Sequence, residues 1–420
     1  MPEAVEIPLP ATAPADRPSP WVRGPVWDSV WMLNAIWLVP IALLLVQGYA
    51  DPTSSRLDVL YFGLTALFWI GHRLGSTWLA YFTEAYRPLL RSEPVRFVVL
   101  PLLVTLACFA IFLPPDDALP WTRGQRFIGM AILDYALVTY HFAAQHFGAL
   151  SLYRSRADRA RCAQTRRHDR LYSLVVGGAL IFLADILAGA VAYPDLWIHH
   201  WIVPRWVASN EHDIRVGALV VLSVATAYML ISEARAPRRS LPRALYIAGL
   251  AAMVAIALQP RSLFLYLAIW TSQHWILAMG LASQTAREEP PPDRGTVRRF
   301  LHALNVRPWA ILVVLAGASV LLLPLFEVEA SLDGGAFYGD RIFGAAAFEL
   351  RTSTWVPALI AIAFATGFVH YLLDRNVYRM SDPRVREAAR GLQPAFDRRP
   401  TATATTHQAS TSPVIPPIRK

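Results

Sequence analysis

The run ILVVLAGASVLLLPL, residues 311 to 325, contains no charged side chain and decides the fold class. Further apolar runs with few or no charges occupy residues 36–46 and 174–187. Each belongs to a stretch near the ~20 residues that a helix needs to cross a bilayer. Because lipid offers the backbone no hydrogen bonds, such runs must be helical. The sequence therefore predicts an all-α, polytopic integral membrane helix bundle.

The composition agrees with this fold class. Of the 420 residues, 55% are hydrophobic and 16% are charged, whereas a soluble protein usually carries about 25% charged residues. The formal net charge is +9, and the surplus is almost entirely arginine. Because these arginines lie in short loops between apolar runs, we expect contacts with anionic lipid headgroups and no nucleic-acid partner.

Hydropathy predicts about ten transmembrane helices within a domain that covers residues 29–373. The pair around Pro260 and Arg261 is read as a tight hairpin, since one helix over both segments would be too long for a bilayer. The predicted spans are 29–49, 58–81, 95–114, 125–152, 171–193, 214–233, 243–259, 261–282, 309–326 and 353–373.

The loop charges predict the orientation. Residues 153–170 carry seven arginines, whereas residues 194–213 carry only Arg205. Every second loop is basic, which places the basic loops and both termini in the cytoplasm. The polar segment 1–28, the basic juxtamembrane segment 374–390 and a disordered tail over 391–420 would then all be cytoplasmic. We expect the chain to lie in the bacterial cytoplasmic (inner) membrane.

Ionisable residues at membrane depth are costly and usually functional. Five histidines lie within predicted spans, on helices that all run from outside to inside, and all five fall in the cytoplasmic half. Asp374 follows the last of them by four residues and so shares its helix face. The five histidines are His72, His141, His146, His274 and His370.

Imidazoles gathered from several helices of a bundle predict a metal site, because neutral imidazole with a carboxylate suits iron, zinc or copper. The five histidines would be ligands and Asp374 a ligand or acid–base catalyst, with Asp134, Gln145 and Gln273 orienting imidazoles. His141 and His146 are about 140° apart on an ideal helix. They would bind the same ion only if the helix is distorted. Otherwise both would be ligands only if two metals are present.

Other functions also fit these residues. Two facing histidines would ligate haem b, which leaves three histidines and Asp374 without a role. The histidines and Asp374 would form a relay in a proton-coupled transporter. The same side chains would only join helices in a non-catalytic scaffold.

Four phrases carry a resemblance to known proteins: HRLGSTWLAYFTEAYR (72–87), YHFAAQHFGALSLYR (140–154), SQHWILAMGLAS (272–283) and HYLLDRNVYRMSDPRVR (370–386). They resemble an uncharacterised family of bacterial polytopic membrane proteins with a His-x-x-x-Gln/His-x-x-Gly block and a His-Tyr-x-x-Asp block. In architecture alone, histidines on several spans are similar to Brp/Blh-type membrane β-carotene dioxygenases, which hold a non-haem iron by histidines.

These observations favour a metal-dependent membrane oxidoreductase that acts on a hydrophobic or lipid-like small molecule. Non-haem iron is the favoured metal. It would activate dioxygen or polarise the substrate.

Overall fold

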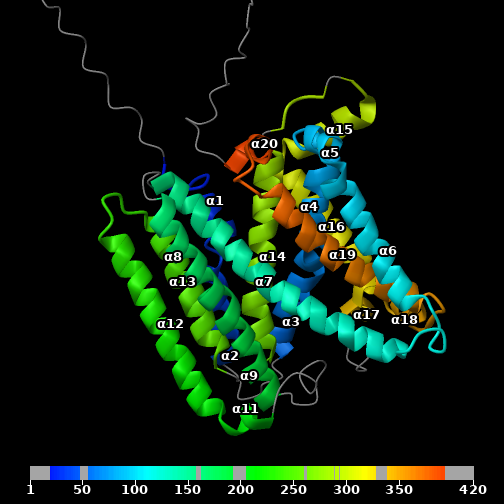
Figure 1. The fold of residues 1–420 in the computed structure, drawn as a ribbon, viewed down its shortest axis with the longest axis horizontal. Coiled ribbons are helices and arrows are strands. Elements are labelled where there is room, and N and C mark those ends of the chain that lie inside the picture. Colours follow the sequence, from blue (N-terminus) through cyan, green and yellow to red (C-terminus); the bar gives the residue numbers. More distant parts are fainter. Residues whose placement is uncertain are drawn as a thin grey trace, which may run out of the picture.

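A computed structural model of the chain describes residues 19–47, 55–157, 162–192, 205–259, 263–287, 289–292, 294–327 and 338–392. Within these ranges the secondary structure is entirely helical and contains no strand (Figure 1). The all-α prediction is therefore confirmed for the described part of the chain. Most of the predicted tail, residues 393–420, and the predicted hairpin at Pro260 and Arg261 lie outside it.

The helices follow the predicted spans closely. In chain order they are α1 (Pro25–Trp31), α2 (Ala35–Gln47), α3 (Ser55–Leu64), η1 (Thr65–Trp69), α4 (Ile70–Phe82), α5 (Arg87–Ser92), η2 (Val95–Val99), α6 (Leu100–Phe112), α7 (Arg123–Ala157), α8 (Cys162–Leu174), η4 (Val175–Ala179), α9 (Leu180–Ala192), α11 (Arg205–Ser209), α12 (Glu211–Ala234), α13 (Leu241–Ala257), α14 (Leu263–Ala286), α15 (Thr296–Asn305), α16 (Pro308–Phe326), α17 (Tyr338–Phe343), α18 (Ala345–Thr352), α19 (Val356–Val377), α20 (Pro383–Ala388) and η6 (Arg390–Leu392).

Several of these helices meet the length and apolarity needed to cross a membrane. Among the described residues six do so, and a seventh counts if α1 and α2, which meet at a 48° bend, form one span. The chain is thus a multi-pass membrane protein by the length and composition of its helices. The six are Val95–Phe112, Arg123–Ala157, Ala163–Ala188, Glu211–Ala234, Pro308–Phe326 and Val356–Val377.

The difference between six such helices and ten predicted spans has a physical reason. The helices that carry His72 and His274 are not among the six. Their polar residues, including Arg73 and Gln273, lower the apolar character of segments that are otherwise long enough to cross. The count of ten therefore remains a prediction for these segments and for the shorter α13.

The two ends of the bundle carry different elements. The short helices α5, α15 and α20 lie together at one end, and α11, α17 and α18 lie toward the other (Figure 1). The basic segments after α4, α14 and α19 therefore share one end. At this end the Arg298 guanidinium, bonded to Glu84, holds the pKa of that carboxyl below its usual value.

A buried ionic network joins four helices. Asp169 of α8 accepts hydrogen bonds from Arg154 of α7 (2.6 Å) and Arg243 of α13 (2.5 Å). Arg243 also bonds Glu233 of α12, whose other carboxylate oxygen accepts the Ser240 N–H at 2.7 Å. All five residues are at least nine-tenths buried. Each charge thus has an opposite partner, which buried charges require.

The two ends of the described chain are held against the bundle. Asp28 is fully buried and accepts the N–H groups of Val22 and Arg23 at 2.8 and 3.0 Å, so residues within the predicted polar segment 1–28 fold back on α1. At the other end, the carbonyls of Gly391 and Leu392 accept bonds from Gln284 and Arg156. The first two residues of the predicted tail are therefore packed.

Candidate metal centre

Four helices bring four of the predicted histidines together. His72 lies on α4, His141 on α7, His274 on α14 and His370 on α19, and each is more than nine-tenths buried. α4 packs against both α14 and α19, and α19 also packs against α7. The cluster therefore lies where these helices meet, inside the bundle.

The four imidazole rings form a closed circuit. The centroid of His72 lies 5.0 Å from that of His274 and 4.9 Å from that of His370. The centroid of His141 lies 4.9 and 4.8 Å from the same two rings. The His274 and His370 centroids are 6.4 Å apart across the circuit. We name His72, His141, His274 and His370 the histidine cluster.

The ligand atoms of the cluster fall into two groups among the described residues. One group is His72, His274 and His370, and the other is His141, His370 and Asp374. Within each group the donor atoms lie within 4.8 Å of one another. With metal–nitrogen bonds of about 2.0–2.1 Å, two ligands of one ion lie roughly 3–4 Å apart. Small side-chain rotations would therefore bring each group to bonding geometry.

Three nitrogen atoms of the cluster have no hydrogen-bond partner among the described residues although they are buried. They are His72 Nδ1, His141 Nε2 and His370 Nε2. A buried polar group without a partner costs free energy, which coordination of an ion would recover. These nitrogens are suited to donate to a cation.

The neighbours of two rings set which nitrogen is free. Gln145 Oε1 accepts a hydrogen bond from His274 Nδ1, and Gln145 Nε2 donates to the His274 carbonyl at 3.5 Å. An amide oxygen only accepts, so Nδ1 carries the proton and Nε2 of His274 keeps its lone pair. His370 Nδ1 lies 3.3 Å from Ser76 Oγ. Such partners usually fix the orientation of metal-binding imidazoles.

Asp374 lies beside two members of the cluster. Its carboxylate oxygens are 3.7 Å from His141 Nε2 and 3.6 Å from His370 Nδ1. The side chain is 12% exposed, so it sits at the margin of the buried cluster. This position is compatible with either predicted role, as a ligand or as an acid–base group.

The structure places His146, the fifth predicted ligand, away from the histidine cluster. His146 Nδ1 lies 2.7 Å from the Tyr246 hydroxyl of α13, and its ring packs against Gly177. Neither ligand group contains it. The five-residue spacing from His141 explains this, because the two side chains leave α7 in directions about 140° apart.

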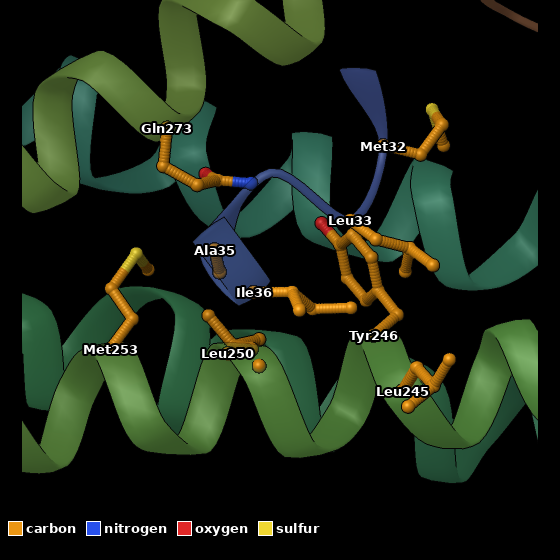
Figure 2. A pocket seen from close by; sticks show the side chains of 10 residues that line it. Met32, Leu33, Ala35, Ile36, Leu245, Tyr246, Leu250, Met253 and Gln273 are labelled. Carbon is orange, nitrogen blue, oxygen red and sulfur yellow. The ribbon is translucent and has the colours of Figure 1, made fainter. Parts of the chain in front are cut away.

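Gln273 belongs to a different surface of α14. It lines a hollow between α13 and the linker from α1 to α2, together with Met32, Leu33 and Tyr246 (Figure 2). Its side chain lies at this hollow beside Tyr246, whereas the side chain of Gln145 accepts a bond from the His274 ring. The adjacent position to His274 lies about 100° around the helix, which turns Gln273 away.

Asp134, the third residue predicted to orient an imidazole, instead accepts a bond from the Tyr371 hydroxyl at 3.1 Å. The ring of Tyr371 lies 4.9 Å from that of His141, so this tyrosine links Asp134 to the cluster. Arg73 interacts with Asp134, lies 5.1 Å over Trp69 and donates to the Ala363 carbonyl.

The backbone around His72 is closely packed. A five-residue π-helical turn, η1, runs directly into α4, and such turns are frequent at functional sites. A Cβ on Gly71 would lie 2.8 Å from the Leu315 carbonyl oxygen of α16. Glycine at this position lets α4 approach α16 and holds His72 at the cluster.

Aromatic rings surround the cluster. Phe142 lies 4.0 Å from the His274 ring, and Trp275 stacks on His72 at 5.9 Å. They add apolar surface around the buried cluster, and a low-dielectric interior strengthens electrostatic interactions. Ser76 was not predicted from the sequence, although its position four residues after His72 puts it on the same face of α4.

Asp185, an acid within the predicted span 171–193, belongs to neither ligand group among the described residues. The carboxylate of Asp185 accepts a hydrogen bond from the Tyr135 hydroxyl.

One prediction tests the orienting role of Gln145. We expect Gln145→Leu to weaken metal binding by about 10–100-fold, because His274 Nδ1 loses its acceptor and the ring loses its fixed orientation. Competition with a chromophoric chelator measures this affinity. Gln125→Leu, on the exposed start of α7, is the control and should leave the affinity unchanged.

The site thus offers imidazole nitrogens and one carboxylate in a buried interior beside aromatic rings. Such a set can bind a transition metal. Comparisons with protein-family models, with curated proteins and with solved structures found no match.

Proposed function

We propose that this chain is a metal-dependent integral membrane oxidoreductase acting on a hydrophobic or lipid-like substrate. The observation that carries the proposal is the histidine cluster, with three buried ring nitrogens that have no hydrogen-bond partner in the described structure. Iron is the favoured metal, because several imidazoles with one carboxylate suit a redox-active first-row ion. When bound, the metal would supply activation of dioxygen or polarisation of the substrate.

The chain's own residues would divide the remaining work. His72, His141, His274 and His370 would hold the metal, and Gln145 would keep His274 in the required tautomer. Asp374 would bind the metal or exchange a proton at its carboxylate, between His141 and His370. The surrounding apolar helices favour a substrate that reaches the site from the lipid phase.

The topology belongs to the same proposal. Ten spans in the bacterial inner membrane, with both termini and the arginine-rich loops in the cytoplasm, would place the cluster in the cytoplasmic half of the bilayer. The arginines would contact anionic lipid headgroups there. The common position of α5, α15 and α20 supports this orientation (Figure 1).

Haem b fits the geometry less well than a non-haem ion. An iron held between any two histidines of the cluster would have the other two rings close by, at centroid distances of 4.8–5.0 Å along the circuit. Those rings occupy the space that the porphyrin needs around the iron.

One observation favours a proton-coupled transporter as the second candidate. The first apolar segment is broken between α1 and α2 with a 48° bend, and Asn34 at the break is fully buried. Broken helices often form the binding sites of transporters. A transporter would move its substrate in a pH-dependent way without a stoichiometric metal.

Metal analysis of the detergent-purified protein by mass spectrometry, with a visible spectrum of the same sample, tests the proposal. We expect at least one transition-metal ion per chain and no Soret band. His274→Ala should bind clearly less metal than the wild type, whereas His168→Ala, a histidine beside Tyr228 and remote from the cluster, should keep the wild-type content. A Soret band would indicate haem b. Folded wild-type protein without metal would leave the transporter as the leading candidate.

A further inference from the structure

The two ligand groups of the cluster share one residue. His370 belongs to the group with His72 and His274 and to the group with His141 and Asp374. A ring nitrogen has a single lone pair and forms one metal bond, but an imidazole has two such nitrogens on different sides of the ring. His370 could therefore serve both groups at once.

The two ring nitrogens of His370 have different neighbours. Nδ1 lies 3.6 Å from Asp374 Oδ1, on the side of the second group. Nε2 is buried and has no hydrogen-bond partner among the described residues. With Nδ1 assigned to the second group, Nε2 is the nitrogen that remains for His72 and His274.

From this geometry we propose that the cluster binds two metal ions bridged by the His370 imidazole. His72 and His274 complete one site, and His141 and Asp374 complete the other. The proposal rests on the proposed function, since it assumes that the cluster binds metal. With bonds of about 2.0–2.1 Å on either side of the ring, the ions would be roughly 6 Å apart.

A bridging His370 imidazole has to lose its N–H proton. A neutral imidazole carries one N–H, and both nitrogens are bound to metal when it bridges. Binding of the second ion therefore displaces this proton to the medium, and Ser76 gives up its contact with Nδ1. Release of protons on metal binding is general for such ligands.

The unequal ligand sets give the two sites different preferences. The first offers imidazoles only and suits copper, zinc or ferrous iron. The second includes a carboxylate that adds negative charge and favours a harder ion. These ligand sets favour a redox-active ion in the first site and a second cation beside Asp374.

Cupric ion alone is the probe for the test, added to the full-length, chelator-treated protein in detergent. After gel filtration we expect two copper ions per chain and an electron paramagnetic resonance spectrum broadened by coupling between them. Asp374→Asn should fall to one ion per chain with an uncoupled spectrum, and so should His72→Ala. Asp134→Asn, an acid bonded to Tyr371 instead, should keep both ions and the coupling.

The outcomes separate the inference from the proposed function. One ion per wild-type chain would overturn the two-ion site and leave the metal-dependent function intact. Two ions without coupling would overturn the bridge through His370. No bound ion would overturn both. Should Asp374→Asn fail to fold by circular dichroism, the stoichiometry and coupling of the wild type decide the question.

Discussion

His370→Ala should remove essentially all bound metal, the largest effect expected of any single substitution in the cluster. His370 is fully buried, and it alone belongs to both described groups of ligand atoms. Its loss leaves two residues in each group, and two ligands do not make the three or four protein ligands of a typical bound transition metal. Metal content measured by mass spectrometry on monodisperse protein checks this result.

His146→Ala is the matched control for His370→Ala. It removes another buried histidine, but one that contacts the Tyr246 hydroxyl and belongs to neither ligand group. We expect the metal content to stay at the wild-type value. Loss of metal in this variant would restore His146 to the ligand set and contradict the arrangement described above.

Asp169→Ala should destabilise the folded protein by about 3–5 kcal/mol, because it leaves charges buried without their partner. Arg154 and Arg243 both donate to this fully buried carboxylate, and through them it joins α7, α8 and α13. A detergent-unfolding titration in mixed micelles, followed by circular dichroism, measures the free energy of unfolding.

Arg170→Ala is the control, since Arg170 is the exposed neighbour of Asp169 on the same helix. Surface changes of this kind usually stay within about 0.5 kcal/mol of the wild type. An equal loss in both variants would mean that α8 tolerates no change here. A small loss for Asp169→Ala would mean that water reaches the network and screens it.

The fold class could be predicted from the sequence because the length of an apolar run is a local property of the chain. Helices occur in the described part of every predicted span, and the loops around α5, α15 and α20 gather at one end (Figure 1). Five histidines were grouped in advance by their predicted depth and helix direction, and four of them form the cluster. Neither criterion separates His146 from the other four.

Rotation about the helix axis was harder to predict. Gln145 and Gln273 were equally good candidates to orient an imidazole, yet only Gln145 faces the cluster, whereas Gln273 lines the hollow beside Tyr246 (Figure 2). Asp134 shares a stripe with His141 but lies two turns away, about 10 Å along the axis, and so reaches Tyr371.

Contacts between distant segments could not be read from the sequence at all. Arg154 looked like a loop arginine that sets topology, and Arg243 was the first residue of the predicted span 243–259, but both bind Asp169 inside the bundle. Nothing in the spacing of 15 and 74 residues indicates such pairing. A periodic pattern reports which face is apolar, whereas an ionic pair depends on the packing of helices that are remote in sequence.

Two partners of Arg73 are synthesised after the helix that carries it. α4 leaves the ribosome before α7 and α19, which supply Asp134 and the Ala363 carbonyl. An arginine in mid-membrane costs about 2.5–3.5 kcal/mol on insertion scales. We therefore expect α4 to remain beside the insertion machinery, in contact with water, until the later helices arrive. Biogenesis of this protein would then depend on retaining an early segment until synthesis is nearly complete.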